Sequence, residues 1–393
     1  MTMLWWSKWS ADRRQVAARF DADLRIRAEY LNRILERERT RADRTGRPLS
    51  MILLGYDGRP RRRRDASAIV AALKTRSRIT DEVGWFDKRT GFAVLPDTPA
   101  AGGRRFAEIV CQTLKAQGVQ TSYAIYQYGA SPPNDPPAPP DSPGRGGSSV
   151  GDRLAGPGRS HKRAVPALAF SGGAADTRSA VGGRVHRLEP LMAQRLPWWK
   201  RSTDVVFAGA GLLAAWPTLV AIGIAIRADS PGPVIFRQRR CGLGGRPFDI
   251  WKFRTMVADA ERQRDTLLSV NEQDGPAFKI RSDPRVTRIG AWLRRTSLDE
   301  LPQLVNVLRG EMTLVGPRPL PVAESHACEP WQRRRMAVTP GLTCIWQVWG
   351  RSRVTFSDWC RMDLRYTATR TLVHDLKIML ATVPAVLKQR GAC

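Results

Sequence analysis

The pattern of apolar and polar positions divides the chain into a charged amphipathic helix, a small α/β region, a polar stretch and a second folded region. Apolar residues recur at helical spacing amid dense charge, so we expect a helix over 1–45 that ends near Gly46 and Pro48. Leu24 and Leu31 lie one heptad apart in this helix. We interpret it as a docking or dimerising element.

Residues 46–128 alternate between strand-like and helix-like segments. In order, we expect a strand, a helix, two strands, a helix and a strand: Leu49–Leu54, Ala66–Thr75, Glu82–Phe86, Gly91–Leu95, Ala101–Ala116 and Thr121–Tyr126. This βαββαβ order predicts a small α/β domain.

The composition changes over residues 129–187. Seven prolines fall between Pro132 and Pro143, and sequence rich in Gly, Ser and Arg follows them. Such a stretch buries too little apolar surface to offset its ordering entropy, so we expect a disordered linker. The second folded domain then covers 188–393.

An apolar segment lies near the start of this second domain. Val205–Ile226 contains 22 residues without a charge, and a straight helix of that length reaches about 33 Å, enough to span a bilayer. Pro217 in its middle favours a bend, and basic residues flank both ends. A re-entrant segment over 203–227 and an ordinary transmembrane helix are therefore both open from the residues alone.

The charge balance narrows the class of partner. The chain has 64 Lys and Arg against 36 Asp and Glu, a net charge of +28, which favours nucleic acid, anionic lipid or a phosphorylated substrate. The basic residues are not interleaved into a recognition helix or an aromatic stacking sheet, and nucleic-acid binding would leave the apolar segment unexplained. We therefore expect no nucleic acid among the partners.

Two adjacent acids, Asp299 and Glu300, are the main candidates for chemistry. The run Ser297-Leu-Asp-Glu300 has the form of a capping box, in which Glu300 would only bond the backbone of Ser297. The surrounding basic residues favour a different role, because they should keep both carboxylates ionised. An ionised carboxylate can attack phosphorus or hold Mg²⁺.

Several blocks of unusual residues follow the apolar segment in a fixed order. They are Lys252-Phe-Arg-Thr-Met256, Leu293-Arg-Arg-Thr-Ser-Leu-Asp-Glu300, Gly310-Glu-Met-Thr-Leu-Val-Gly-Pro-Arg-Pro319, Thr339-Pro-Gly-Leu-Thr-Cys-Ile-Trp-Gln-Val-Trp-Gly-Arg351 and Met362-Asp-Leu-Arg-Tyr366. With these blocks, the chain from Leu196 to Cys393 resembles the bacterial sugar transferase family of monotopic phosphoglycosyl transferases.

The resemblance implies an α-rich α+β membrane domain. Its re-entrant helix-break-helix would turn at Pro217, and amphipathic helices, including Ala291–Leu293 and Leu372–Leu387, would lie in the membrane interface. It also implies a location at the bacterial inner membrane, with the catalytic and N-terminal parts on the cytoplasmic side.

The implied activity is the first membrane step of exopolysaccharide, capsule or O-antigen synthesis. A sugar-1-phosphate passes from a nucleoside diphosphate sugar, by family analogy a UDP-hexose, to undecaprenyl phosphate. Asp299 corresponds to the nucleophile that forms a covalent aspartyl-phosphosugar, and Glu300 to its partner, with Mg²⁺ at Asp299 and Glu300. The alternative is a catalytically dead regulatory membrane protein that signals through the N-terminal domain, against which the intact acidic pair argues.

Further residues match blocks that would bind substrate. We expect Lys252, Arg254 and Arg318 to contact phosphate, although a surface charge is the alternative for each. Asp363 and Tyr366 match a late block and would contact substrate or brace the site. Arg351 is a weaker candidate of the same kind.

Residues 46–128 also resemble a GGDEF-type nucleotide cyclase domain in the layout of their strands and helices. The motif itself is absent, since the hairpin reads Gly84-Trp-Phe-Asp-Lys-Arg-Thr-Gly91. Gly55 stands where a metal carboxylate would be needed, which leaves only Asp57, and two-metal chemistry requires paired acids. The resemblance thus implies a degenerate, non-cyclising domain for docking or self-association, which allows a homodimer.

Overall fold

The computed structural model describes residues 29–56, 63–87, 90–129, 185–263, 265–280, 282–350 and 354–387. These residues form two compact units, one ending at Met192 and the other beginning at Ala193. The predicted helix before residue 29 and most of the predicted linker, residues 130–184, lie outside the described residues.

The N-terminal unit is built on a five-stranded sheet with the strand order β2-β3-β1-β4-β5. β1 pairs antiparallel with both β3 and β4, whereas β5 runs parallel to β4. The strands are β1 Leu49–Tyr56, β2 Glu82–Trp85, β3 Thr90–Leu95, β4 Thr121–Tyr128 and β5 Val185–Arg187, and the helices are α2 Arg63–Arg76 and α3 Ala100–Ala116.

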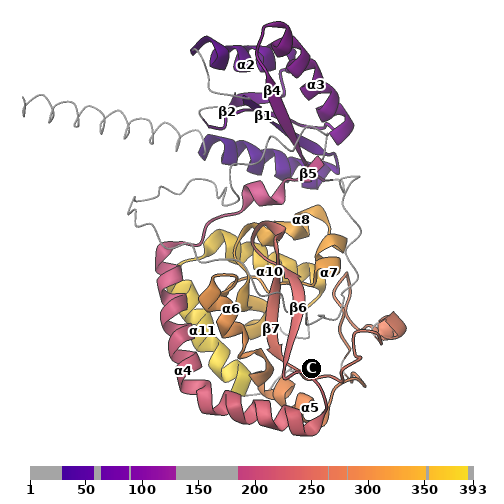
Figure 1. Cartoon of the computed structure of the whole chain (residues 1–393), viewed down its shortest axis with the longest axis vertical. Helices are drawn as coiled ribbons and strands as arrows, with labels where there is room; N and C mark the ends of the chain where they lie inside the picture. The colour runs from indigo at the N-terminus through magenta and orange to yellow at the C-terminus, as the bar shows by residue number, and fades with distance from the viewer. Residues whose placement is uncertain are drawn as a thin grey trace, which may run out of the picture. The chain divides into compact units, whose positions relative to one another are not determined.

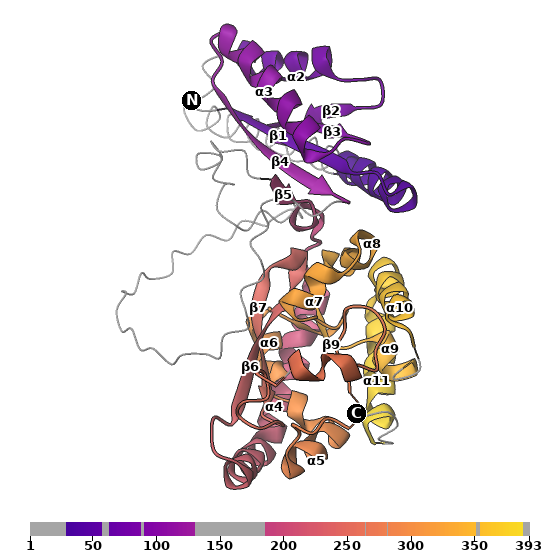
Figure 2. The same ribbon diagram turned by 90° about the vertical axis from the view of Figure 1, so that its right-hand side faces the viewer.

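Helices cover both faces of this sheet (Figures 1 and 2). Successive side chains of a strand point to opposite faces. Met51 and Leu53 therefore enter a core shared with the helix of residues 29–45, while Ile52 and Leu54 enter one shared with α2 and α3. The predicted βαββαβ order is confirmed.

The helix of residues 29–45 docks on its own unit. Its apolar stripe, which includes Leu31, Ile34 and Leu35, is buried against the sheet. These described residues are thus used for intramolecular packing.

The boundary between the units differs from the predicted one. Val185–Arg187 were placed in the linker, but they pair with β4, and the 3-10 helix Glu189–Met192 buries Leu191 against the same sheet. The second unit begins at Ala193 instead of 188. Three residues are too short a pattern for an edge strand to be recognised in sequence.

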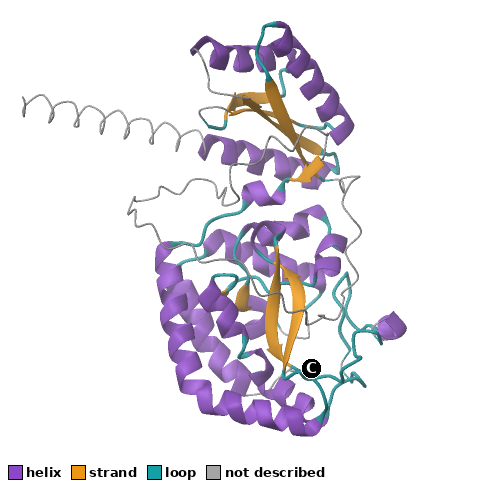
Figure 3. Cartoon of the chain, in the orientation of Figure 1, coloured by secondary structure: helices purple, strands orange, loops and turns teal. Residues whose placement is uncertain are grey.

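The C-terminal unit surrounds two small sheets with helices (Figure 3). β6 and β7 form an antiparallel hairpin, and β8 and β9 form a parallel pair. The strands are β6 Ile235–Cys241, β7 Pro247–Phe253, β8 Thr313–Val315 and β9 Gly341–Thr343. The helices are α4 Trp198–Asp229, α5 Arg288–Thr296, α6 Gln303–Arg309, α7 Val322–Ala327, α8 Pro330–Arg333, α9 Ile345–Trp349, α10 Phe356–Thr369 and α11 Leu372–Leu387, with 3-10 turns at Leu243–Gly245, Asp265–Val270, Leu298–Glu300 and Arg334–Ala337.

The predicted membrane segment lies in α4. Among the described residues it is the one helix long and apolar enough to cross a membrane. Leu213, Trp216 and Ile224 expose 81%, 65% and 67% of their surface, so this side of the helix has no protein to pack against. Such an apolar surface is suited to lipid.

Pro217 lies inside α4, which is assigned as one continuous helix. Figure 1 shows that the helix turns sharply part-way along its length. A helix-interior proline removes one backbone donor and favours such a bend. The fold thus contains a bent helix where a helix-break-helix was predicted.

α11 and α5 also expose apolar side chains. Leu380 and Val383 of α11 expose 73% and 58% of their surface, and Trp292 of α5 exposes 45%. The two helices predicted to lie in a membrane interface therefore present apolar residues outward.

Candidate active site

The acidic pair lies in a tight connection between two helices. α5 ends at Thr296, and Ser297 adopts a left-handed backbone with φ 57°, while its N–H donates to the carbonyl of Arg294 at 3.1 Å. A single 3-10 turn, Leu298–Glu300, then leads toward α6. The chain thus carries Asp299 and Glu300 into the site on a short, well-anchored turn.

Glu300 is held by two cationic side chains. Lys252 Nζ donates to its Oε1 at 2.8 Å, and Arg318 donates to Oε1 at 2.5 Å and to Oε2 at 3.2 Å. The two bonds from Arg318 make the forked pairing typical of guanidinium and carboxylate. The capping-box alternative is therefore wrong, because Ser297 makes no side-chain capping bond and Glu300 is directed elsewhere.

The neighbouring carboxylates differ in acidity. Burial alone would raise the pKa of Glu300, but Arg318 and Lys252 lower it well below its usual value. Burial raises the pKa of Asp299 to about 6, against the opposing effect of Lys252. Both groups are anionic at neutral pH, as expected, but Asp299 lies much closer to its titration range than the sequence indicated.

Asp299 is left free of direct pairing. Among the described residues no group donates a hydrogen bond to its carboxylate, although Lys252, Arg294 and Arg318 are near enough to affect its charge. Its side chain lines an open cavity of about 1830 Å³ that also receives these three cations. A buried, weakly paired carboxylate facing an open cavity is a candidate nucleophile.

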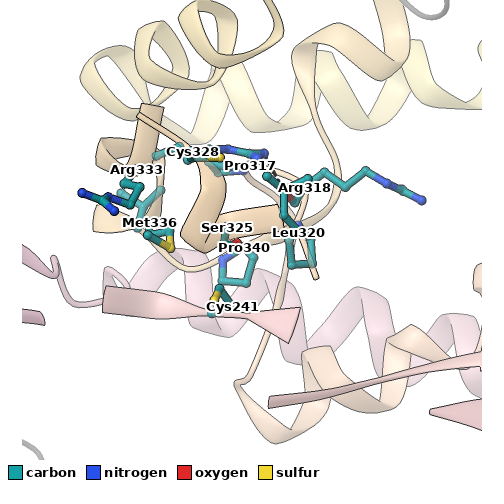
Figure 4. A pocket seen from close by; sticks show the side chains of 13 residues that line it. Cys241, Pro317, Arg318, Leu320, Ser325, Cys328, Arg333, Met336 and Pro340 are labelled. Carbon is teal, nitrogen blue, oxygen red and sulfur yellow. Dashed lines mark hydrogen bonds between the residues drawn. The ribbon is translucent and has the colours of Figure 1, made fainter. Parts of the chain in front are cut away.

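The backbone around Arg318 is fixed by a close crossing of two chain segments. A Cβ at Gly341 would lie 2.0 Å from the backbone nitrogen of Gly316, so only glycine fits at this crossing. Behind it, Arg335 donates to the Arg318 carbonyl at 2.6 Å. Figure 4 shows Arg318 at the edge of a small pocket shared with Cys241 and Cys328, its side chain extending away from that pocket.

Asp363 braces this arrangement from within the protein. Only 1% of its surface is exposed, and it pairs with Arg335 at 2.6 Å. Burial raises its pKa to about 6, and Arg335 opposes that rise. Asp363 therefore supports the arginine that holds the Arg318 backbone, which is the bracing role among the two predicted for it.

Tyr366 lies in a separate buried network. Its hydroxyl lies 2.8 Å from the carbonyl oxygen of Val315 and 2.7 Å from a carboxylate oxygen of Asp375, either of which can accept its one proton, and Lys200 Nζ donates to it at 3.1 Å. Lys200 and Asp375 also form a buried ion pair. This network ties α4, α10 and α11 to β8, and the large cavity lined by Asp299 does not include Tyr366.

Arg254 serves the end of the membrane helix. It lines the cavity, but its guanidinium donates to the carbonyl of Ser230 at 2.6 Å and to that of Pro231 at 3.0 Å. A Cβ at Gly232 would lie 2.2 Å from the same guanidinium, which explains the glycine in this turn. Arg254 thus positions the end of α4, and its predicted phosphate contact stays a prediction.

The remaining predicted residue, Arg351, lies outside the described residues. Of the predicted site, Asp299, Glu300, Lys252 and Arg318 thus lie together around one cavity, whose lining also includes Arg254.

Two positioning residues were missed by sequence reasoning. Asp204, on α4, accepts hydrogen bonds from Thr313 Oγ1 and from the N–H of Leu314, both at 2.9 Å. Asn306 joins α6 to β7, because it accepts from the N–H of Trp251 at 3.0 Å and donates to the carbonyl of Asp249 at 2.7 Å. An acid at the border of an apolar helix was the available signal for Asp204.

The acidic pair also determines how a metal could bind. Among the described residues there is no group of three or more His, Cys, Asp or Glu side chains that could hold an ion. Mg²⁺, however, is commonly held by one or two carboxylates together with substrate phosphates. Asp299 and Glu300 fit that mode, in which the substrate supplies further oxygens.

Comparison with known proteins identifies the family of the C-terminal unit. The model of the family described as bacterial sugar transferase matches residues 195–389. The exopolysaccharide production protein ExoY of Rhizobium meliloti is 38% identical over 197 residues, which are 49% of this chain and 87% of ExoY. The chain belongs to the bacterial sugar transferase family.

Other members of the family are similar over the same share of the chain. The UDP-glucose:undecaprenyl-phosphate glucose-1-phosphate transferase of Caulobacter vibrioides is 44% identical over 213 residues, 52% of this chain and 75% of that protein. The galactosyl transferase CpsE of Streptococcus agalactiae is 42% identical over 194 residues, 49% of this chain and 43% of CpsE. The match to this chain thus covers less than half the length of CpsE.

A solved structure, of a DGC protein from Thermotoga maritima, matches with a TM-score of 0.25 and 19% identity. The match covers 27% of this chain and 81% of that one. A likeness at this level carries no argument, so the cyclase-like character of the N-terminal unit stays a prediction.

Proposed function

We propose that this chain transfers a sugar-1-phosphate from a nucleoside diphosphate sugar to undecaprenyl phosphate, through a covalent intermediate on Asp299. The names of relatives support this substrate pair, including a UDP-glucose:undecaprenyl-phosphate glucose-1-phosphate transferase and an undecaprenyl-phosphate galactose phosphotransferase. UDP-glucose and UDP-galactose are accordingly the first donors to test.

One observation supports the proposal most strongly. Glu300 is neutralised by Lys252 and Arg318, whereas Asp299 beside it faces the cavity without a hydrogen-bonding partner among the described residues. The two adjacent acids therefore have different tasks: Glu300 fixes the two cations, and Asp299 is left to react.

The reaction then has two displacements at the same phosphorus. A carboxylate oxygen of Asp299 attacks the β-phosphorus of the donor, and the bond to the bridging oxygen breaks, so nucleoside monophosphate leaves with that electron pair. An oxygen of the polyprenyl phosphate next attacks the aspartyl phosphosugar, and the Asp299 carboxylate leaves unchanged. The product is a polyprenyl diphosphate sugar.

Lys252 and Arg318 contribute by charge and alignment. Phosphoryl transfer depends mainly on neutralising oxygens and keeping the attacking and leaving groups in line. Each cation has N–H groups beyond those given to Glu300, and these can donate to the phosphate oxygens. Glu300 keeps both cations in place before substrate arrives.

Mg²⁺ belongs to the same proposal. Asp299 and Glu300 are the residues that would hold it, together with the phosphates of the donor. When bound, the ion would neutralise charge on the diphosphate.

We also propose that α4 enters and leaves the bacterial inner membrane on the cytoplasmic side. Its exposed apolar side, its internal Pro217 and the basic residues at both ends support that topology. This places the cavity at the surface where cytoplasmic sugar nucleotides and a membrane-bound acceptor meet.

For the N-terminal unit we propose a non-catalytic role in docking or self-association. The hairpin segment Gly84–Gly91 lacks the run of acids that cyclisation needs. The unit would therefore position the transferase or join two copies of it.

The decisive experiment uses Asp299→Asn in the full chain. Purified protein with UDP-glucose or UDP-galactose should release UMP in a burst before acceptor is added, and the variant should release none, while Asp249→Asn on the exposed side of β7 keeps the burst. Retained turnover by Asp299→Asn would exclude it as nucleophile. Absence of any burst from the unaltered protein would favour the catalytically dead regulatory alternative.

A further inference from the structure

The lining of the large cavity includes two chemically different groups of side chains. One group is the acids and cations described above. The other group, which we call the apolar end, consists of apolar side chains from the turn before α6, α6 itself, β8, β9 and α11, namely Leu301, Leu304, Leu314, Leu342, Met379 and Val386. A single cavity whose lining contains both a charged and an apolar group of side chains is suited to an amphiphilic ligand.

α11 forms one wall of the apolar end, and it is apolar on two sides. Met379 and Ala385 line the cavity, while Leu380 and Val383 on the outside expose 73% and 58% of their surface. A helix that is apolar on several sides is not suited to water on any of them. Lipid on the outer side and a hydrocarbon ligand on the inner side would satisfy both.

The polar groups of this wall satisfy one another. The hydroxyls of Thr343 on β9 and Thr382 on α11 are hydrogen-bonded at 2.9 Å, and Thr382 donates in turn to the carbonyl of Ile378 at 2.7 Å. The hydroxyls are therefore occupied within the protein. A hydrocarbon chain in contact with this wall leaves no donor of the threonine pair unsatisfied.

The cavity is also larger than one donor molecule requires. Small-molecule sites usually occupy roughly 300–1,000 Å³, whereas this cavity measures about 1830 Å³. The additional space extends to α11. The residues of α11 that line it are uncharged: Met379, Thr382, Ala385 and Val386.

We propose that the apolar end, between α6, β9 and α11, holds the isoprene units nearest the phosphate of the acceptor. The inference rests on the proposed function and assigns a place to its second substrate. The acceptor phosphate would then point along the cavity toward Asp299, and the rest of the chain would continue into the bilayer. This wall selects acceptors by the presence of the first isoprene units.

The test compares Ala385→Trp, which fills the cavity, with Val383→Trp, which adds the same ring on the lipid side of α11. Each protein is assayed in detergent with isopentenyl phosphate and with farnesyl phosphate as acceptor. The unaltered protein should prefer farnesyl phosphate in kcat/KM by about tenfold or more, because burying each methylene contributes about 0.8 kcal/mol. Ala385→Trp should lose most of that preference, and Val383→Trp should keep it.

The UMP burst without acceptor separates this inference from the proposed function. Ala385→Trp should keep the burst, since the donor half of the reaction does not use the apolar end. If the ring disturbs folding and the burst is lost, Met379→Trp on the same wall carries the same expectation. A full burst together with an unchanged preference in these variants would overturn the inference, as would equal loss in Val383→Trp. A missing burst in the unaltered protein would overturn the proposed function instead.

Discussion

Asp299 and Glu300 are neighbours in sequence, yet their surroundings give them opposite properties. Glu300 receives three charge-assisted hydrogen bonds from Lys252 and Arg318, which keep it ionised. Asp299 has the same cations nearby but no hydrogen bond among the described residues, so burial dominates and raises its pKa to about 6. A carboxylate of this kind is ionised near neutral pH and is a better nucleophile than one of ordinary acidity.

The burst should therefore depend on pH through Asp299. Below its pKa of about 6 the carboxyl is protonated and cannot attack, so the burst rate should fall about tenfold for each pH unit and level off above neutrality. Because Glu300 titrates well below its usual range, it adds nothing to this profile. The measurement is a quench-flow series of UMP release from pH 5 to 8.

The variant Lys252→Met tests whether Lys252 lowers the pKa of Asp299. Lys252 lowers the pKa of Asp299, so its removal should move the midpoint of the profile to higher pH. A rate independent of pH down to 5, or a midpoint that moves lower in this variant, would contradict the account of Asp299.

Among the elements, the close crossing between the segment after β8 and the start of β9 determines where Arg318 lies. Gly316 and Gly341 approach so closely that a side chain on either meets backbone within 2.0 to 2.7 Å. Arg335, held by Asp363, fixes the same loop from behind. The cation that pairs with Glu300 thus depends on a contact between two backbones.

Gly341→Ala should destabilise the C-terminal unit. The added methyl would lie 2.0 Å from the nitrogen of Gly316, and overpacking of this kind typically costs about 1–3 kcal/mol or more. The chosen control is Gly209→Ala in α4, where nothing lies within 4 Å of the new Cβ, and alanine is favoured over glycine in a helix by about 1 kcal/mol. Thermal unfolding in detergent should show a lower midpoint for Gly341→Ala alone. An unfolding midpoint for Gly341→Ala equal to that of the unaltered protein would mean that the two crossing segments move apart without loss of stability.

The elements of the N-terminal unit were predictable because its strands and helices carry regular apolar spacing. β1 alternates Met51, Ile52, Leu53 and Leu54 between two cores, and the turns around it are rich in glycine and proline. The strand β5 was missed because its three residues gain their conformation from β4, a tertiary contact that a short sequence pattern does not contain.

At the scale of the whole molecule, two forces favour the membrane. The net charge of +28 attracts anionic lipid and is screened by salt. The free energy gained by burying the exposed apolar side of α4 in lipid is not screened by salt, because it comes from removing apolar surface from water. These two contributions can be separated by extraction.

Washing membranes with about 1 M salt, where the screening length falls to about 3 Å, should leave the protein bound, and detergent should release it. Replacing exposed Leu213 and Ile224 by lysine should weaken insertion, since a lysine at the centre of a membrane helix costs about 2.5–3.5 kcal/mol. Lysine in place of exposed Ile79, in the N-terminal unit, is the control. Release of the unaltered protein by salt alone would show that attachment is electrostatic.

That Asp299, Glu300, Lys252 and Arg318 line one cavity was predictable, because they lie close in sequence or in distinctive blocks. The roles of Arg254 and Tyr366 were not, because their partners come from distant segments: Tyr366 meets Lys200 from 166 positions away. A single sequence contains the residue types of such a network but not their pairing. Burial of Asp299 was likewise a property of the packed structure.

The two hydrogen bonds from β8 to Asp204 have a mechanical consequence. Asp204 belongs to α4, and β8 leads directly to the loop that carries Arg318. A change in bilayer thickness that tilts α4 is therefore expected to pull on β8 and on the loop that carries Arg318. Under the proposed function, the lipid around this protein would act on the site through α4, and the rate of the proposed transfer would depend on the composition of the membrane.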